Sequence, residues 1–407
     1  MLITNIVEDL DVIFLAIENF GAISLAYGDD VAWVVADQVR HCAYAFSNGK
    51  VELSVLSPSV FTLHRGTIGE GADRLALDEL CTLIGATPFH VGGANIMVVA
   101  SLHEDLGDAQ AACMQHATVM SSEWVAGYRR DMELAAQFVK GADDATLITL
   151  WRPIRSTKLQ NTVLHYEAVP QMFDQDGRYR DCDAERDALF RLGMGWIYDL
   201  ANLMAGIDEL HSDPTPCISV QLSPQSLAHG VSGCCARWLP ALRRLAASPD
   251  VAARPVVEIS GNFAGTSIES MMEHIANFRR LGVSLSVANF ASTDLNIGAL
   301  VTLDPDIVKL SSTFMHAAAL DPANCRRLQL LFKLAGTMAR TVVVDGVDRE
   351  RHMQIAQVLG SEWVKGRAVG EPAFGRHWKI VPPVQECSPV AAALPSEGTT
   401  PRLQAAL

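Results

Sequence analysis

At residues 166–171 the sequence reads Tyr166-Glu167-Ala168-Val169-Pro170-Gln171, and this is the first of a series of short strings in which a polar residue ends or follows an apolar run. In chain order the others are Val220-Gln221-Leu222-Ser223-Pro224, Val257-Glu258-Ile259-Ser260, Val287-Ala288-Asn289-Phe290-Ala291, Val308-Lys309-Leu310 and Val344-Asp345-Gly346-Val347. Polar residues that repeatedly fall at the ends of apolar runs predict one shared site, at the edge where the strands end.

The residues around these strings alternate between strand-like and helical patterns. Strand-like runs occur at 146–151, 162–168, 217–222, 255–259, 283–287, 307–310 and 341–344. Helical stretches separate most of them, at 184–205, 267–281 and 326–339. This alternation over about 240 residues predicts either a (β/α)8-type barrel or a doubly wound sheet.

The order and spacing of the strings resemble the EAL family of cyclic-di-GMP phosphodiesterases, whose motifs read roughly YEALLR, NLSP, LEITE, DDFGTG, LKID, AEGVE and QGY. The resemblance extends from Leu147 to Phe374. It favours an α/β fold with a TIM-like (β/α)8 barrel over the doubly wound sheet. Functional residues of such a barrel lie at the C-terminal ends of its strands, which is where the polar strings fall.

The resemblance also implies a reaction, the hydrolysis of a phosphodiester by two divalent metals. The family holds these metals with side chains at positions 167, 221, 258, 288 and 289, helped by those at 309 and 345. This sequence keeps Glu167, Glu258 and Lys309, but the other positions read Gln221, Ala288, Asn289 and Asp345. Two metals must be charge-balanced by carboxylates, and Mg²⁺ demands near-ideal octahedral geometry. We therefore expect no cofactor, no bound metal and no catalytic residue, with Glu167, Glu258, Lys309 and Asp345 as vestiges.

Nine residues remain candidates for ligand binding: Glu167, Gln171, Gln221, Glu258, Asn289, Lys309, Asp345, Lys365 and Arg367. Two interpretations stay open for Lys365 and Arg367, which either replace metal charge against the phosphates of cyclic-di-GMP or are solvated surface cations. Glu167 and Glu258 are either ligand-binding residues or buried partners of Lys309. Without metals, two facing carboxylates repel, and the pKa of one of them should be raised.

Residues 1–120 predict a smaller α/β domain, with a strand at 12–17, a helix at 30–46, a hairpin at 50–56 and 60–63, and a strand at 95–102. Their order resembles a GGDEF (diguanylate cyclase) domain, and a small α/β domain of another kind is the alternative. The signature loop reads Leu56-Ser57-Pro58-Ser59-Val60-Phe61, and Ala16 stands at a metal-aspartate position. We therefore expect a degenerate domain without cyclase activity.

Three further segments complete the predicted organisation. A helical pattern over 121–143 connects the two domains, the barrel occupies 144–382, and a segment at 383–407 rich in Pro, Ser, Ala and Thr is expected to be a flexible tail. The loop at 291–296 departs from the family, in which it couples the metal site to dimerisation. A homodimer therefore stays open.

Composition restricts the class of protein. Hydrophobic residues make up 49% of the 407 residues and the formal net charge is −14, which favours a large core and disfavours nucleic-acid binding. No run of 18 apolar residues occurs, so we expect no membrane span. The nine cysteines are scattered and lack CxxC spacing, which is typical of reduced cysteines in a cytoplasmic protein. The twelve histidines show no HExxH or paired spacing.

Together these observations predict a catalytically inactive EAL-type regulator in the bacterial cytoplasm. It would act through an unidentified protein partner, through metal-independent binding of cyclic-di-GMP, or through both. The alternative is a weakly active cyclic-di-GMP phosphodiesterase, and only this alternative requires Mg²⁺.

Overall fold

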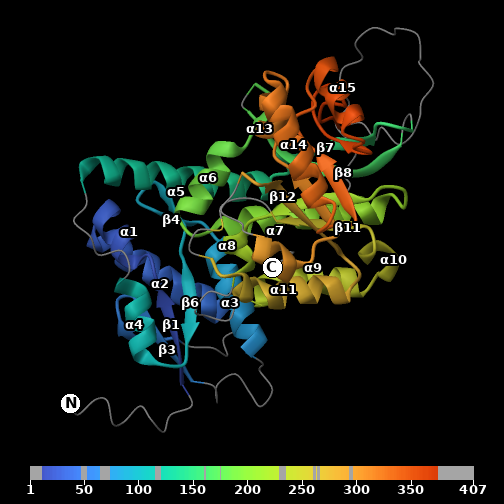
Figure 1. Cartoon of the computed structure of the whole chain (residues 1–407). Helices are drawn as coiled ribbons and strands as arrows, with labels where there is room; N and C mark the ends of the chain where they lie inside the picture. Colours follow the sequence, from blue (N-terminus) through green and yellow to red (C-terminus); the bar gives the residue numbers. More distant parts are fainter. Residues whose placement is uncertain are drawn as a thin grey trace.

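The computed structural model describes residues 12–46, 53–64, 74–114, 121–159, 162–174, 176–228, 235–259, 263, 266–292 and 297–374. The tail expected at 383–407 lies outside the described residues, as do residues 293–296 of the loop at 291–296. Figure 1 shows an N-terminal lobe, which we define as residues 12–114, beside a larger barrel drawn in green to red. No helix among the described residues is long and apolar enough to span a membrane.

The N-terminal lobe is built on an antiparallel four-stranded sheet in the order β2-β3-β1-β6. Its strands are β1 (Val12–Ile17), β2 (Ser54–Ser57), β3 (Val60–His64) and β6 (Ala100–His103). The predicted strand at 12–17 is confirmed, and so is the hairpin turning through Ser57-Pro58-Ser59. The helices of the N-terminal lobe are α1 (Phe20–Tyr27), α2 (Asp29–Phe46), α3 (Arg74–Ala86) and α4 (Leu106–Met114). The buried residues of α2 recur at helical spacing, which confirms the helix predicted at 30–46.

The single strand predicted at 95–102 is wrong. Instead, β5 (Ala94–Ile96) forms a separate hairpin with β4 (Phe89–Val91), and β6 pairs with β1. The side chain of Asn19 explains the interruption, because its Nδ2 donates to the Met97 carbonyl at 3.0 Å and its Oδ1 accepts from the Val99 N–H at 2.9 Å. These main-chain groups are therefore engaged by a side chain rather than by a neighbouring strand.

The second unit is a closed barrel of eight strands. Around the ring they are β8 (Val163–Phe173), β10 (Ile218–Leu222), β11 (Pro255–Ile259), β12 (Ser284–Phe290), β13 (Ile307–Leu310), β14 (Thr341–Val344), β15 (Trp363–Val364) and β7 (Leu147–Ser156). Pairing of β10 with both β11 and β8 closes the ring, so the barrel prediction is confirmed and the doubly wound sheet is wrong. β7 runs antiparallel to both of its neighbours, and the short β9 (Tyr179–Asp181) extends β8 as a hairpin.

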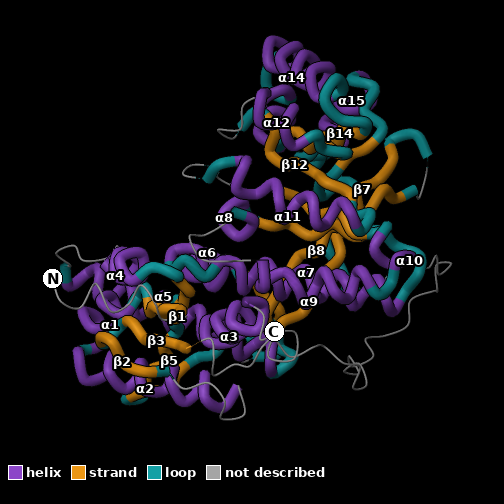
Figure 2. The backbone as a smooth tube through the Cα atoms, turned by 90° about the horizontal axis from the view of Figure 1, so that it is seen from below, coloured by secondary structure: helices purple, strands orange, loops and turns teal. Residues whose placement is uncertain are grey.

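Helices surround the barrel (Figures 1 and 2). They are α6 (Asp183–Arg191), α7 (Gly195–Ser212), α8 (Pro224–Leu227), α9 (Cys235–Ala246), α10 (Pro249–Ala252), α11 (Ile268–Arg280), α12 (Ile297–Leu303), α13 (Ser312–Ala318), α14 (Pro322–Ala335) and α15 (Glu350–Val358). The single helix predicted at 184–205 is wrong, because Gly193, with a φ of 74°, separates α6 from α7.

The long helix α5 (Ser122–Asp143) lies between the lobe and the barrel and contacts both. At its start the Ser121 hydroxyl accepts from the Trp124 N–H at 3.2 Å. Farther along, Arg191 of α6 donates to both carboxylate oxygens of Asp131, at 2.8 and 2.7 Å. The barrel core continues through α5 to Ala86 and Met97 of the lobe, whereas the other buried apolar residues of the lobe form clusters of their own. The helix is therefore packed against both units rather than acting as a free linker.

Candidate functional site at the barrel mouth

Six charged side chains meet at the end of the barrel where the parallel strands terminate, and we name them the mouth network. They are Arg152 on β7, Glu167 on β8, Glu258 on β11, Lys309 on β13, and Asp345 and Lys365 directly after β14 and β15. Glu258 and Lys309 each stand one residue before the end of their strand. The shared site predicted from the polar strings is therefore present for these strands.

Two lysines connect the carboxylates of the mouth network. Lys309 Nζ lies 2.6 Å from Glu167 Oε1 and also forms an ion pair with Glu258 Oε2. Lys365 Nζ lies 3.0 Å from Glu167 Oε2 and 3.0 Å from Asp345 Oδ2. Each oxygen of Glu167 thus faces a different ammonium group. Glu167 and Glu258 therefore are buried charge partners of Lys309, and their role in ligand binding stays a prediction.

Arg152 and His165 also lie at this site and were not predicted from the sequence. Arg152 lies opposite Glu167 in the β7–β8 register, and its guanidinium is 4.0 Å from Glu167 Oε2. His165 is buried two residues before Glu167 on the same strand. Burial and the nearby Lys309 hold the pKa of His165 well below its ordinary value, so this imidazole is neutral. Residues 165 and 167 lie two positions apart on a strand and therefore on the same face, and this spacing could have identified His165 as a neighbour of Glu167.

The two glutamates have opposite pKa shifts. Burial by itself would raise the pKa of Glu167, but Lys309 and Lys365 outweigh it and hold this pKa below its ordinary value. The pKa of Glu258 is raised, first by burial and then by the charge of Glu167, despite Lys309. The prediction that one carboxyl has a raised pKa is confirmed, although burial contributes more than repulsion.

Lys365 is held in its charged form. Burial would lower the pKa of its ammonium group, but Glu167, Asp345 and Glu258 reverse this effect and raise the pKa. Three carboxylates and three cations therefore meet in the mouth network, so its formal charges cancel. An arrangement of this kind is already electrostatically satisfied without any added ion.

The remaining candidate residues lie around this network. Gln171 is buried on β8, where it donates to Asp181 of β9, and Gln221 is exposed on β10. Asn289 is half-buried in a bulge of β12 with a φ of 56°, a conformation that Asn tolerates better than most residues. The Arg367 side chain is 70% exposed, and its Nε lies 3.7 Å from Asp348. The lysines of the mouth network instead pair with Glu167, Glu258 and Asp345.

A buried carboxyl beside the mouth gives a testable pH dependence. Asp199 of α7 accepts from the Ser223 N–H at 2.8 Å. Burial raises its pKa from 3.8 to about 6, although hydrogen bonds from Ser223 and Ser226 oppose the shift. The folded protein therefore holds this proton more tightly than the unfolded chain does. The stabilisation is complete below about pH 4 and is lost as the pH rises through about 6.

We expect Asp199→Asn to remove this pH-dependent loss, which amounts to about 3 kcal/mol at most for a shift of about two pKa units. Urea unfolding of both proteins between about pH 4 and 7 measures the difference in slope directly. The exposed Asp187→Asn should keep the wild-type slope. Parallel curves for wild type and Asp199→Asn would contradict the assignment.

Comparison with known proteins finds relatives of one kind. The sequence profile of the EAL domain matches residues 136–372. The "Probable cyclic di-GMP phosphodiesterase PdeA" of Escherichia coli K12 is 22% identical over 273 residues, covering 65% of this chain and 36% of PdeA. The "Cyclic di-GMP phosphodiesterase TpdA" of Vibrio parahaemolyticus is 23% identical over 211 residues, covering 51% of this chain and 34% of TpdA. The chain thus spans about a third of the length of these curated relatives.

Solved structures show the same fold at low sequence identity. The S helix-GGDEF-EAL part of Vibrio cholerae LapD matches with a TM-score of 0.52 and 13% identity, covering 88% of each chain. The FimX EAL domain of Pseudomonas aeruginosa bound to c-di-GMP matches with a TM-score of 0.51 and 17% identity, covering 59% of this chain and 96% of the FimX domain. Since the EAL profile covers more than half of the residues, this protein belongs to the EAL domain family.

Proposed function

We propose that this protein is a catalytically inactive EAL-type signalling regulator, preceded by a degenerate GGDEF-like domain. It acts through protein–protein interaction, through metal-independent binding of cyclic-di-GMP, or through both. The observation that carries the proposal is the position of Lys365, whose ammonium group lies 3.0 Å from both Glu167 and Asp345. A permanent cation of the chain thus occupies the carboxylate oxygens that a metal centre would need.

The donor set of the mouth fits two Mg²⁺ ions poorly. Glu167 and Glu258 are paired with lysines, and Ala288, which is buried, offers no ligand atom. Mg²⁺ prefers oxygen ligands in octahedral geometry, and two such ions need several carboxylates free of competing cations. A lysine within hydrogen-bonding distance repels a metal at the same oxygens. These features support an inactive site over a weak phosphodiesterase.

The charge balance of the mouth bears on the choice between the two modes of action. Lys309 and Lys365 are neutralised by carboxylates, and the exposed Arg367 lies beside Asp348 rather than in the mouth. An anionic dinucleotide would therefore meet little uncompensated positive charge. This favours protein–protein interaction as the main mode, with cyclic-di-GMP binding as the second.

The N-terminal lobe supports a regulatory role in the same way. Ala16, at a position where the GGDEF resemblance places a metal aspartate, is fully buried at 0% exposure. The turn at 57–59 is a tight hairpin in which the Val60 N–H donates to the Ser57 hydroxyl at 3.1 Å. Neither feature supplies the carboxylates that two Mg²⁺ ions require.

Hydrolysis of cyclic-di-GMP by the purified chain, with Mg²⁺ or Mn²⁺ present, tests the proposed inactivity. We expect formation of the linear dinucleotide at the same background rate for wild type and Glu167→Gln. A wild-type rate that Glu167→Gln abolishes would establish the weak phosphodiesterase instead. A rate above background that is equal in both proteins would come from a contaminating enzyme, because it does not depend on Glu167.

Titration calorimetry with cyclic-di-GMP separates the two modes. Binding that is equal with Mg²⁺ and with EDTA, and weaker in Lys365→Ala, would establish a metal-independent receptor. Absence of binding in both buffers would leave protein–protein interaction as the mode of action. Binding that requires Mg²⁺ would overturn the proposed metal independence.

A further inference from the structure

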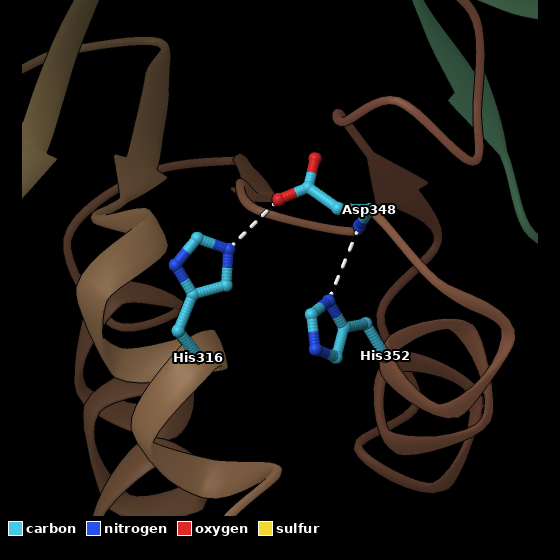
Figure 3. Close-up of side chains that lie close together, drawn as sticks. All are labelled: His316, Asp348 and His352. Carbon is cyan, nitrogen blue, oxygen red and sulfur yellow. Dashed lines mark hydrogen bonds and ion pairs between the residues drawn. The ribbon is translucent and has the colours of Figure 1, made fainter.

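A cluster of two histidines and an aspartate lies outside the mouth network. His316 is on α13, His352 is on α15, and Asp348 is in the segment between β14 and α15. Each offers one ligand atom, and these atoms all lie within 4.8 Å of one another. Figure 3 shows one Asp348 carboxylate oxygen directed toward the His316 ring, and His352 facing the main-chain nitrogen of Asp348. We name these three residues the His/Asp cluster.

The cluster is positioned by contacts of the kind that orient metal ligands. His352 Nδ1 lies 2.9 Å from the Gly346 carbonyl oxygen and 3.2 Å from the Asp348 N–H nitrogen. The Arg367 N–H donates to Asp348 Oδ1 at 3.0 Å, and the exposed Arg367 Nε lies 3.7 Å from the same oxygen. Asp348 Oδ2, which lies 2.8 Å from His316 Nε2, is therefore the oxygen that remains for a metal. Ligating histidines and carboxylates are commonly fixed by such hydrogen bonds to the main chain.

Gly346 allows α13 to approach this segment. Its φ is 82°, and a Cβ atom added there would lie 2.8 Å from Ser312 Cβ and 3.1 Å from His316 Nε2. A larger residue at 346 would therefore displace His316 from Asp348. The close approach of α13, the segment 346–348 and α15 depends on this glycine.

The three residues differ in exposure. His352 is 7% exposed, the Asp348 side chain is 17% exposed, and the His316 side chain is 48% exposed. Two ligands are thus held firmly within the fold, and the third can be reached from solvent. An ion could enter from the His316 side without unfolding of the barrel.

We propose that His316, Asp348 and His352 form a binding site for a divalent transition metal of the Zn²⁺ class, outside the mouth of the barrel. Two imidazoles and one carboxylate suit Zn²⁺, which binds nitrogen and oxygen ligands in tetrahedral geometry, whereas Mg²⁺ prefers oxygen ligands. Coordination at His316 Nε2 and Asp348 Oδ2 replaces the contact that these two atoms make with each other at 2.8 Å. A water molecule or a partner's side chain completes the coordination.

The site links two parts of the molecule. A bound metal joins α13 to α15 and to the segment that begins with Asp345, a member of the mouth network. Gly346 and Arg367 both contact the His/Asp cluster. Gly346 directly follows Asp345, and Arg367 comes two residues after Lys365. The metal therefore stabilises the end of the barrel that carries the Lys365–Asp345 pair. The inference does not depend on whether the mouth is catalytically active.

Co²⁺ is the probe for this site, because nitrogen- and oxygen-coordinated Co²⁺ absorbs visible light. The tag-free full chain, stripped with EDTA and dialysed, is titrated with Co²⁺ and then with Zn²⁺ at neutral pH. We expect one equivalent of Co²⁺ to give an absorption band that Zn²⁺ abolishes, and Zn²⁺ to raise the temperature of unfolding.

Variants identify the ligands. His316→Ala, which changes an exposed residue, should weaken Co²⁺ binding at least about tenfold, and Asp348→Asn and His352→Gln should do the same. The matched control is His41→Ala, because His41 lies 3.4 Å from Asp37 and this pair has no third ligand among the residues that the structure describes. No band in the wild type, or a band that His316→Ala leaves unchanged, would overturn the proposal.

Discussion

Replacing Lys309 by Met should lower the free energy of unfolding by about 3–5 kcal/mol, the cost of removing one partner from a buried ion pair. Lys309 is 1% exposed, and its ammonium group contacts Glu167 at 2.6 Å and also contacts Glu258. Methionine fills similar space but leaves Glu258 buried without a cation. Urea unfolding at neutral pH measures the loss.

Two companion variants make this result interpretable. Lys158→Met removes an exposed lysine whose Nζ lies 3.9 Å from Glu362, and its cost should stay below about 1 kcal/mol. The double variant Lys309→Met/Glu258→Gln should recover part of the stability, because it also removes the orphaned charge. Equal losses for Lys309→Met and Lys158→Met would contradict a buried charge network.

The barrel could be predicted from the sequence because its strands are short apolar runs with polar ends. The strands predicted at 255–259, 307–310 and 341–344 coincide with β11, β13 and β14. Interruptions were harder to predict. The break between β5 and β6 depends on a hydrogen bond from Asn19, about eighty residues away in sequence, which no local pattern contains.

The site was predictable as a set of positions but not as a set of contacts. The ends of the apolar runs that form β11, β13 and β14 identified Glu258, Lys309 and Asp345, and the resemblance to the EAL family identified Lys365. The sequence left open whether Lys365 faces a ligand or solvent, and the structure places its ammonium group between Glu167 and Asp345. Which carboxylate a long, flexible lysine reaches depends on side-chain geometry, and periodicity carries no information about it.

The His/Asp cluster was missed for a similar reason. A search for HExxH or other paired histidine spacing does not detect His316 and His352, which come from different helices. The four-residue spacing of Asp348 and His352 at the start of α15 was the available signal. It becomes meaningful only when α13 brings His316 within 2.8 Å of Asp348.

Replacing Lys365 by Gln should turn the mouth into a cation-binding site. In the wild type, Glu167 Oε2 and Asp345 Oδ2 each lie 3.0 Å from the Lys365 ammonium group. The substitution removes this shared cation. We expect a loss of about 3 kcal/mol in the free energy of unfolding without metal, because one partner of a mostly buried ion network is gone. Mg²⁺ should then restore about 2.7 kcal/mol when its concentration is about 100 times its dissociation constant.

Mg²⁺ distinguishes the mouth from the His/Asp cluster, since it prefers oxygen ligands over imidazole. Thermal unfolding with and without Mg²⁺ should show a shift in Lys365→Gln and none in wild type. Arg367→Gln is the matched control, because it removes a neighbouring cation whose side chain is 70% exposed and contacts Asp348 instead of the mouth. If Mg²⁺ leaves Lys365→Gln unchanged, Lys365 does not occupy a cation position, and its ammonium group is not what keeps metal out of the mouth.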